Sequence, residues 1–169
     1  MATLLREHGV AYAVIGAAAM AVHGVSRATR DLDLLVMSLD CLSPSTWTAL
    51  DDVQVDIRRG DADDPLAGMV RVASAADAPI DVVVGRAGWQ RAAIERALMR
   101  TVEGLSVPVV TAADLVLLKL YAQGPQDTWD IEQLLSSGDR PGIIAAVERS
   151  LSALPEDARR LWARVVGPR

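Results

Sequence analysis

The segment that most restricts the fold is residues 30–36, whose sequence is RDLDLLV. Charged residues and leucines alternate over its first half, and its second half is wholly apolar. Successive side chains of a strand point to opposite faces, so this pattern predicts a strand with one polar face at its beginning. Asp31 and Asp33 would then project side by side, while Leu32 and Leu34 face the core.

The composition supports a folded domain around that strand. The chain has 169 residues, of which 51% are hydrophobic and 23% are charged. This length suits one domain, or one core with a small appendage, and supplies enough apolar material for a core. The same proportions exclude a disordered chain, a collagen-like chain and a bare coiled coil.

Hydrophobic periodicity and turn residues predict an α/β organisation with two parts. Residues 1–110 are expected to form an α/β core, and residues 111–169 a helical C-terminal segment. The predicted strands are residues 11–15, 30–36, 53–58, 69–73 and 80–84, with an extended stretch over 101–110 that turns at Gly104. The predicted helices are residues 1–8, 17–22, 45–50, 89–98, 112–122, 126–135, 143–151 and 156–165.

Charge and cysteine content limit the classes of partner. The net charge is −5, so a polyanionic substrate would have to be held by a local patch. Cys41 is the only cysteine, which excludes a disulfide framework and a zinc site built mainly from thiolates. No apolar run approaches the roughly 20 residues of a membrane helix, and the first residues do not resemble a signal peptide. We therefore expect a cytoplasmic protein without a membrane-bound part.

The paired carboxylates point to a metal. Asp31 and Asp33 repel each other where the dielectric constant is low, so a cation is expected between them. No histidine or cysteine lies nearby in the sequence, and oxygen ligands alone favour Mg²⁺ or Mn²⁺. The alternative is a solvated strand edge whose aspartates point into water.

Gly16 is the second feature with chemical meaning, because it ends a predicted strand and opens a predicted helix. The free N–H groups at a helix start, together with the helix dipole, form an anion site. A phosphate held there would lie close to metal ions on the next strand. The alternative is an ordinary turn between a strand and a helix.

Two stretches carry a resemblance to a known family. Residues 12–36, YAVIGAAAMAVHGVSRATRDLDLLV, resemble the nucleotidyltransferase superfamily that includes DNA polymerase β, and look most like its compact prokaryotic AbiEii-type members. Residues 114–135, DLVLLKLYAQGPQDTWDIEQLL, resemble the downstream helices of the same family. The matching positions are Gly16, Ala17, His23, Gly24, Arg27, Thr29, Asp31 and Asp33 in the first stretch, and Asp114, Lys119, Asp127 and Asp130 in the second.

The resemblance implies a third carboxylate on a neighbouring strand. Asp81 lies in the apolar segment PIDVVV, where a lone charge is costly without a partner. Asp56 lies in the more polar segment VQVDIRR, where it could simply be exposed. We therefore favour Asp81 over Asp56.

The resemblance also implies a fold and an activity. The fold would be a mixed, mostly antiparallel sheet flanked by helices, and the enzyme would move a nucleoside monophosphate from a nucleoside triphosphate to a hydroxyl acceptor. Asp31, Asp33 and Asp81 would hold Mg²⁺ or Mn²⁺ and act in catalysis by two metal ions. The nucleotide would be bound by Gly16, Ala17, Arg27 and Lys119.

The acceptor and the partners stay open at this stage. RNA, a protein hydroxyl and a small alcohol all fit, and the small-alcohol case would be an enzyme of the antibiotic adenylyltransferase kind. A homodimer, or the toxin of a toxin–antitoxin pair with its antitoxin as partner, is also compatible with the resemblance. For Trp89 and Trp129 we expect core packing rather than stacking on a base.

Two departures from the family pattern favour a rival function. Ala17 stands where the family has glycine or serine, and Gln126 stands where it has a lysine. The rival is a catalytically weakened module that kept the fold and binds a nucleotide or a protein partner.

Overall fold

A single mixed sheet organises the molecule. The computed structural model describes residues 1–26, 31–102 and 104–167. The described strands form one sheet in the order β3-β4-β5-β2-β1-β7-β6. They are β1 (Tyr12–Ile15), β2 (Leu32–Val36), β3 (Val53–Arg59), β4 (Gly68–Ser74), β5 (Ile80–Val84), β6 (Leu98–Val102) and β7 (Leu105–Val109). The pairs β1–β7 and β2–β5 are parallel and the other neighbouring pairs are antiparallel, which confirms the predicted mixed sheet.

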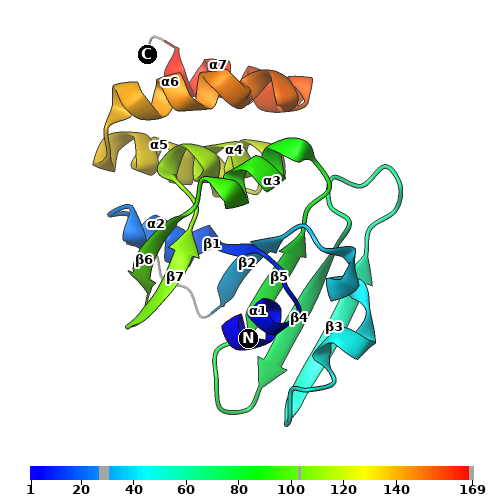
Figure 1. Ribbon diagram of the computed structural model, residues 1–169. Helices are drawn as coiled ribbons and strands as arrows, with labels where there is room; N and C mark the ends of the chain where they lie inside the picture. Colours follow the sequence, from blue (N-terminus) through cyan, green and yellow to red (C-terminus); the bar gives the residue numbers. More distant parts are fainter. Residues whose placement is uncertain (27–30, 103, 168–169) are drawn as a thin grey trace.

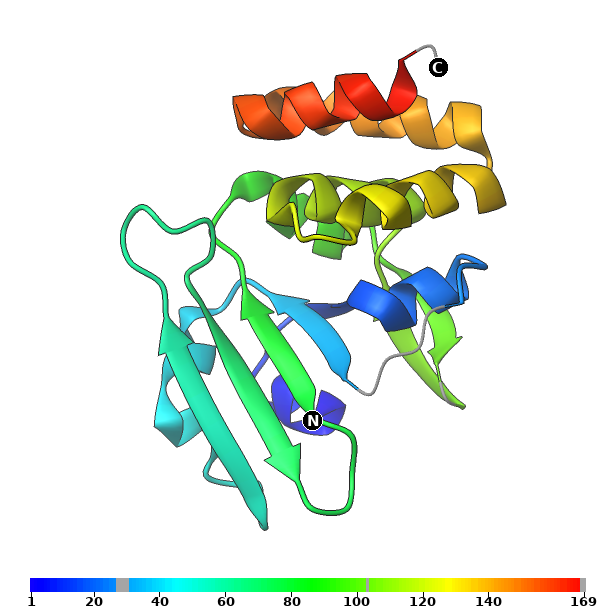
Figure 2. The same ribbon diagram turned by 180° about the vertical axis from the view of Figure 1, so that it is seen from behind.

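The helices gather mainly on one side of the sheet. They are α1 (Ala2–Glu7), α2 (Gly16–Val22), α3 (Gly88–Glu95), α4 (Ala112–Ala122), α5 (Asp127–Ser137), α6 (Arg140–Ser150) and α7 (Glu156–Val166). Helices α4 and α5 lie next to the strands, and α6 and α7 lie farther out (Figure 1). The reverse view in Figure 2 shows the same order of layers. The division of the chain at residue 110 into two units stays a prediction.

Capping and turn residues in the sequence predicted most of the boundaries of helices and strands, as α4 illustrates. It begins and ends as predicted, and the Thr111 hydroxyl accepts a hydrogen bond from the Asp114 backbone N–H over 3.2 Å. This bond satisfies one of the N–H groups that a helix start leaves without a partner.

Within the described residues, no helix has both the length and the apolar character needed to cross a bilayer.

Two predicted helices were wrong in part. The helix expected over residues 45–50 is replaced by two short 3-10 turns, η1 (Leu39–Leu42) and η2 (Pro44–Trp47). Thr46 and Trp47 donate side-chain hydrogen bonds to the backbone carbonyls of η1, and such bonds compete with a regular helix. The helix expected over residues 89–98 ends at Glu95 instead, because the following residues pair with β7 as strand β6.

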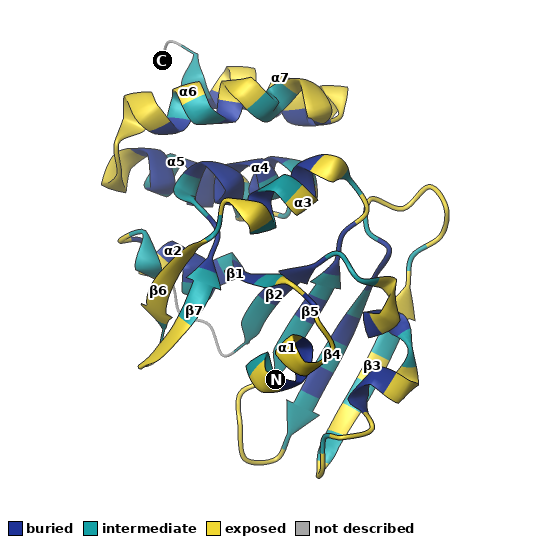
Figure 3. Ribbon diagram, in the orientation of Figure 1, coloured by how far each residue is buried: buried dark blue, intermediate teal, exposed yellow. Residues whose placement is uncertain are grey.

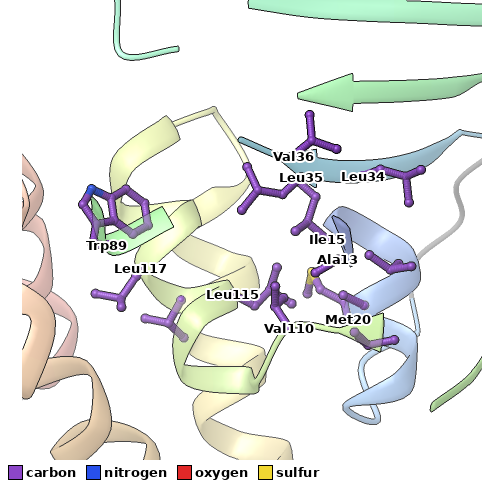
Figure 4. Close-up of a cluster of buried hydrophobic side chains, with 14 of the residues drawn as sticks. Ala13, Ile15, Met20, Leu34, Leu35, Val36, Trp89, Val110, Leu115 and Leu117 are labelled. Atoms are coloured by element: carbon purple, nitrogen blue, oxygen red, sulfur yellow. The ribbon is translucent and has the colours of Figure 1, made fainter. Parts of the chain in front are cut away.

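The core lies where β2 and β1 meet α2 and α4. Figure 3 shows buried residues concentrated along these elements. Leu35 of β2, Met20 of α2 and Leu117 of α4 are at most 1% exposed, and Figure 4 shows these side chains in the buried cluster. Cys41 is also fully buried, and burial, followed by the charge of Asp40, raises the pKa of its thiol to about 11. The lone cysteine is therefore a neutral core residue.

We expect Leu35→Ala to lower the free energy of unfolding by about 2–5 kcal/mol, because it leaves a cavity in the middle of the sheet. Leu39→Ala removes the same atoms from a side chain that is 65% exposed, and should change stability by less than about 0.5 kcal/mol. Urea denaturation followed by circular dichroism measures both. Equal losses for the two variants would contradict this account of the core.

Candidate functional site

Charged side chains form a line across four neighbouring strands. Asp56 of β3 lies opposite Arg71 of β4, Arg71 lies opposite Asp81 of β5, and Asp81 lies opposite Asp33 of β2. Residues directly opposite each other on paired strands project from the same face of the sheet. We call these four residues the charged row. Its register places Asp81 next to Asp33, as the resemblance implies.

Arg71 joins two carboxylates at the middle of this site. Its Nη1 donates a hydrogen bond to Asp81 Oδ2 over 2.7 Å, and its Nη2 donates to Asp31 Oδ2 over 3.0 Å. The hydrogen bond to Asp31, followed by the charge of Asp81, raises the pKa of the Arg71 guanidinium above its ordinary value. Asp31 lies two residues before Asp33, so the guanidinium supplies positive charge to a cluster of three carboxylates.

Sequence reasoning did not identify Arg71. It expected a cation between Asp31 and Asp33, whereas an arginine of the protein lies between Asp31 and Asp81. A signal was present, because Arg71 is the only charged residue of the strand GMVRVAS, where small and apolar residues surround it. An isolated charge in such a strand indicates a partner on a neighbouring strand.

Asp81 is more enclosed than Asp31. Its side chain is 13% exposed, against 36% for Asp31. Oδ2 is held by Arg71, while Oδ1 is buried and has no hydrogen-bond partner. A buried acceptor without a partner is costly, and a ligand or an ion is a common explanation for one.

These carboxylates fit a divalent cation by their chemistry. Oxygen donors suit Mg²⁺ and Mn²⁺, and the unpaired Oδ1 of Asp81 is available to a ligand. Their present arrangement holds Arg71, however, and among the described residues no three histidine, cysteine, aspartate or glutamate side chains form a ready metal-binding group. A metal ion would therefore have to compete with the guanidinium.

Asp56, the other candidate for the third carboxylate, lies at the outer end of the charged row. Its side chain is 56% exposed and accepts a hydrogen bond from Arg58 Nε over 3.0 Å. Two strands, β4 and β5, separate it from Asp33. The geometry thus places Asp81, and not Asp56, next to Asp33.

Gly16 touches the cluster from the end of β1. Its φ is +63°, in the left-handed region that favours glycine. A Cβ atom at this position would overlap Asp33 Oδ2 and lie 2.7 Å from Asp33 Cγ. Glycine is therefore required for two reasons, the backbone conformation and the close approach of the aspartate.

A cavity of about 420 Å³ opens beside this contact. It brings together three of the predicted site residues, Gly16, Asp33 and Lys119. The other lining residues are Ile15, Pro65, Leu66, Val83, Gln90, Leu115, Leu118, Tyr121, Ala122 and Asp127. Val83 follows Asp81 by two residues on β5, so the cavity lies over the same face of the sheet as the charged row.

The other two residues predicted to bind the nucleotide are Ala17 and Arg27. Ala17 is buried, at 9% exposure, and is not among the described residues that line the cavity. Arg27, like Thr29, lies outside the described residues.

A second cavity of about 460 Å³ lies against α6, beside the buried Asp114 and its partner Arg96. None of the residues predicted for catalysis lines this cavity.

Lys119 is held in place by two acidic residues of α5. Its Nζ lies 2.8 Å from Asp127 Oδ1 and 2.6 Å from Asp130 Oδ2. All three side chains are largely buried, and a buried charge is tolerated only when a charge of opposite sign is paired with it. An ammonium group has three donors, so these bonds leave one for a ligand in the cavity.

His23 and Trp89 make contacts that stabilise the fold, whereas Trp129 is exposed. His23 Nε2 lies 2.8 Å from the Val110 carbonyl oxygen, which fits a residue at a helix end. Trp89 is buried and packs edge-on against Tyr121, with ring centroids 5.2 Å apart. The prediction of core packing was wrong for Trp129, which is 50% exposed on α5.

Comparisons with known proteins identify the fold. No protein-family model matches the chain, and no curated protein sequence matches it. The structure is similar to that of the antibiotic-resistance factor ANT(2'')-Ia, with a TM-score of 0.56 and 10% identity over 89% of this chain and 87% of the other. It is also similar to the lincosamide antibiotic adenylyltransferase LnuA, lincomycin-bound, with a TM-score of 0.50 and 14% identity over 81% and 93%.

The chain has the nucleotidyltransferase-type α/β fold. The two similarities extend over most of each chain, so they confirm the fold class expected from the resemblance. At these identities they establish the fold alone. The AbiEii-type assignment stays a prediction.

We expect Gly16→Ala to destabilise the protein more than Gly9→Ala does. Gly9 has nearly the same φ, +65°, but an added Cβ there would meet nothing within 4 Å. Both variants lose about 1 kcal/mol to the left-handed backbone, and only Gly16→Ala also displaces Asp33. We expect the difference in unfolding free energy, measured by urea denaturation, to be about 1–3 kcal/mol. Equal losses would contradict the close contact with Asp33.

Proposed function

We propose that this protein transfers a nucleoside monophosphate from a nucleoside triphosphate to a hydroxyl acceptor, with Mg²⁺ or Mn²⁺ as cofactor. The observation that carries the proposal is the cluster of Asp31, Asp33 and Asp81 on one face of the sheet, beside Gly16 and the cavity. The fold is compatible with this function because LnuA, which shares it, is an adenylyltransferase.

The three aspartates would hold the divalent cation. When bound, the ion lowers the pKa of the attacking hydroxyl and neutralises charge on the triphosphate. Asp81 keeps Oδ1 free of any hydrogen bond, so it is the carboxylate best suited to accept the proton of that hydroxyl. Asp33, pressed against Gly16, is held at the mouth of the cavity where the nucleotide would bind.

Lys119 and Gly16 would position the nucleotide. The remaining donor of the Lys119 ammonium can reach a phosphate, while Asp127 and Asp130 keep the side chain in place. Gly16 lines the same cavity, and the backbone N–H groups at the start of α2 that follow it would donate to the phosphates. The apolar wall formed by Leu118 and Val83 suits the nucleoside.

A small alcohol is the acceptor best matched by the structural neighbours. Both are named for antibiotic resistance or for an antibiotic substrate, and LnuA was solved with lincomycin bound. RNA or a protein hydroxyl as acceptor, a homodimer, and a toxin–antitoxin role rest on the sequence resemblance alone.

A second candidate function is a nucleotide-binding or partner-binding module without catalysis. Arg71 favours it, because its guanidinium is already paired with two of the carboxylates that a metal ion requires. The buried and unpaired Oδ1 of Asp81 opposes it. An assay of nucleotidyl transfer separates these functions, and Mn²⁺ binding tests the carboxylates as a metal site.

The protein and Mg²⁺ are incubated with each α-³²P nucleoside triphosphate in turn, together with a cell extract or a panel of hydroxylated antibiotics. We expect at least one nucleotide to give a ³²P-labelled acceptor. We expect Asp81→Asn to reduce this transfer by at least about 10³-fold, because it removes both a metal ligand and a proton acceptor. Asp56→Asn should retain nearly full activity, since Asp56 is exposed and remote from Asp33. The absence of transfer to any acceptor, together with intact nucleotide binding, would favour the second candidate.

Arg71→Gln should bind Mn²⁺ about tenfold more tightly than the unaltered protein, because a cation that competes for Asp31 and Asp81 has been removed. Electron paramagnetic resonance of free Mn²⁺ measures this affinity without any turnover. Arg58→Gln is the matched control, since the guanidinium of Arg58 pairs with the exposed Asp56 at the outer end of the charged row. Unchanged or weaker Mn²⁺ binding in Arg71→Gln would show that the carboxylates are not a metal site.

A further inference from the structure

Gln90 is a fully buried polar residue in the wall of the cavity. It lies in the first turn of α3 and is 0% exposed. Its Oε1 accepts hydrogen bonds from the backbone N–H groups of Arg86 and Ala87, each over 2.8 Å. An oxygen is required to accept both bonds, so the positions of the amide oxygen and nitrogen are determined.

The other end of this amide lacks a partner among the described residues. Gln90 Nε2 is buried and makes no hydrogen bond within that part of the chain. A buried donor without a partner is costly, and helix capping does not explain it. Capping needs only the amide oxygen as an acceptor, so it accounts for Oε1 and leaves the buried Nε2 donor unexplained.

The position of Gln90 in the wall of the cavity indicates that a ligand is the missing partner of Nε2. Four side chains in the described part of the chain have a buried polar atom without a hydrogen bond, and Gln90 is the one of these four that lines the cavity. The neighbouring wall is apolar, with Leu66, Leu115 and Leu118 among its residues. A flat heterocyclic base bound against this wall would meet few polar groups, and Nε2 would be its donor.

We propose that Gln90 is a specificity residue, whose Nε2 donates a hydrogen bond to a ring nitrogen or carbonyl oxygen of the nucleotide base. This inference rests on the proposed function, since it assumes that the cavity receives the nucleotide. Gly16 and Asp33 belong to the carboxylate cluster, so we expect the phosphates beside them and the base against other lining residues, among which Gln90 has an unpaired donor. Gln90 is 0% exposed, so a base reaches Nε2 only when the side chains that cover it move aside.

The test compares nucleotide binding by three proteins. The unaltered protein, Gln90→Glu and Gln90→Met are titrated by calorimetry with the non-hydrolysable α,β-methylene forms of the four nucleoside triphosphates. The best-bound nucleotide is then compared with analogues of its base in which one acceptor atom is removed. Gln90→Glu keeps the helix cap and replaces the donor by an acceptor, while Gln90→Met removes both.

We expect the unaltered protein to bind one analogue about tenfold more weakly than the parent nucleotide, as the loss of one neutral hydrogen bond predicts. Both variants should bind the parent nucleotide at least about tenfold more weakly and no longer distinguish it from that analogue. Gln54→Glu makes the same chemical change at an exposed position of β3 and should bind as the unaltered protein does. If Gln90→Glu does not fold, Gln90→Met alone decides the test.

Two results would overturn the inference while leaving the proposed function intact. One is normal nucleotide binding by both variants, and the other is a uniform loss for all nucleotides in which the preference among analogues persists. A protein that binds none of the four nucleotides would overturn the proposed function and this inference together.

Discussion

The pairing of Arg71 with two of three clustered carboxylates on one face of a sheet is the constraint on which this structure depends. Asp33 and Asp81 lie side by side on parallel strands, and Asp31 lies two residues from Asp33. Arg71 contributes the positive charge that allows such a cluster to persist in the folded chain. The same contacts link β4 to β5 and to Asp31, the residue that precedes β2.

Packing around Gly16 connects this cluster to the cavity. The left-handed glycine lets the end of β1 approach Asp33 closely, and α4 closes the space above with Lys119 and Leu118. Lys119 depends on α5 for its partners, so three separate parts of the chain must pack correctly before the cavity exists. A site built in this way is rigid, because each of its charged groups is held by a neighbour.

Local patterns carried much of this information. The alternation of residues 30–36 located β2 and set Asp31 and Asp33 on one face, and the apolar surroundings of Asp81 marked it as a charge that needs a partner. Thr111 and Asp114 located the start of α4. Where a segment's conformation depended on distant pairing, as in strand β6 after Glu95, the local pattern was insufficient and the helix was predicted too long.

The sequence by itself therefore determined the α/β class, most of the elements and the identity of the acidic residues. Tertiary structure alone decided the charged row and the two residues that sequence reasoning missed, Arg71 and Gln90. Arg71 contacts a residue 10 positions away and another 40 positions away, because β4, β5 and β2 are neighbours in the sheet although β2 is remote from the other two in the sequence. The physical reason is that periodicity reports which face of its own strand a side chain occupies, whereas hydrogen-bonded pairing between remote segments decides which side chains then meet.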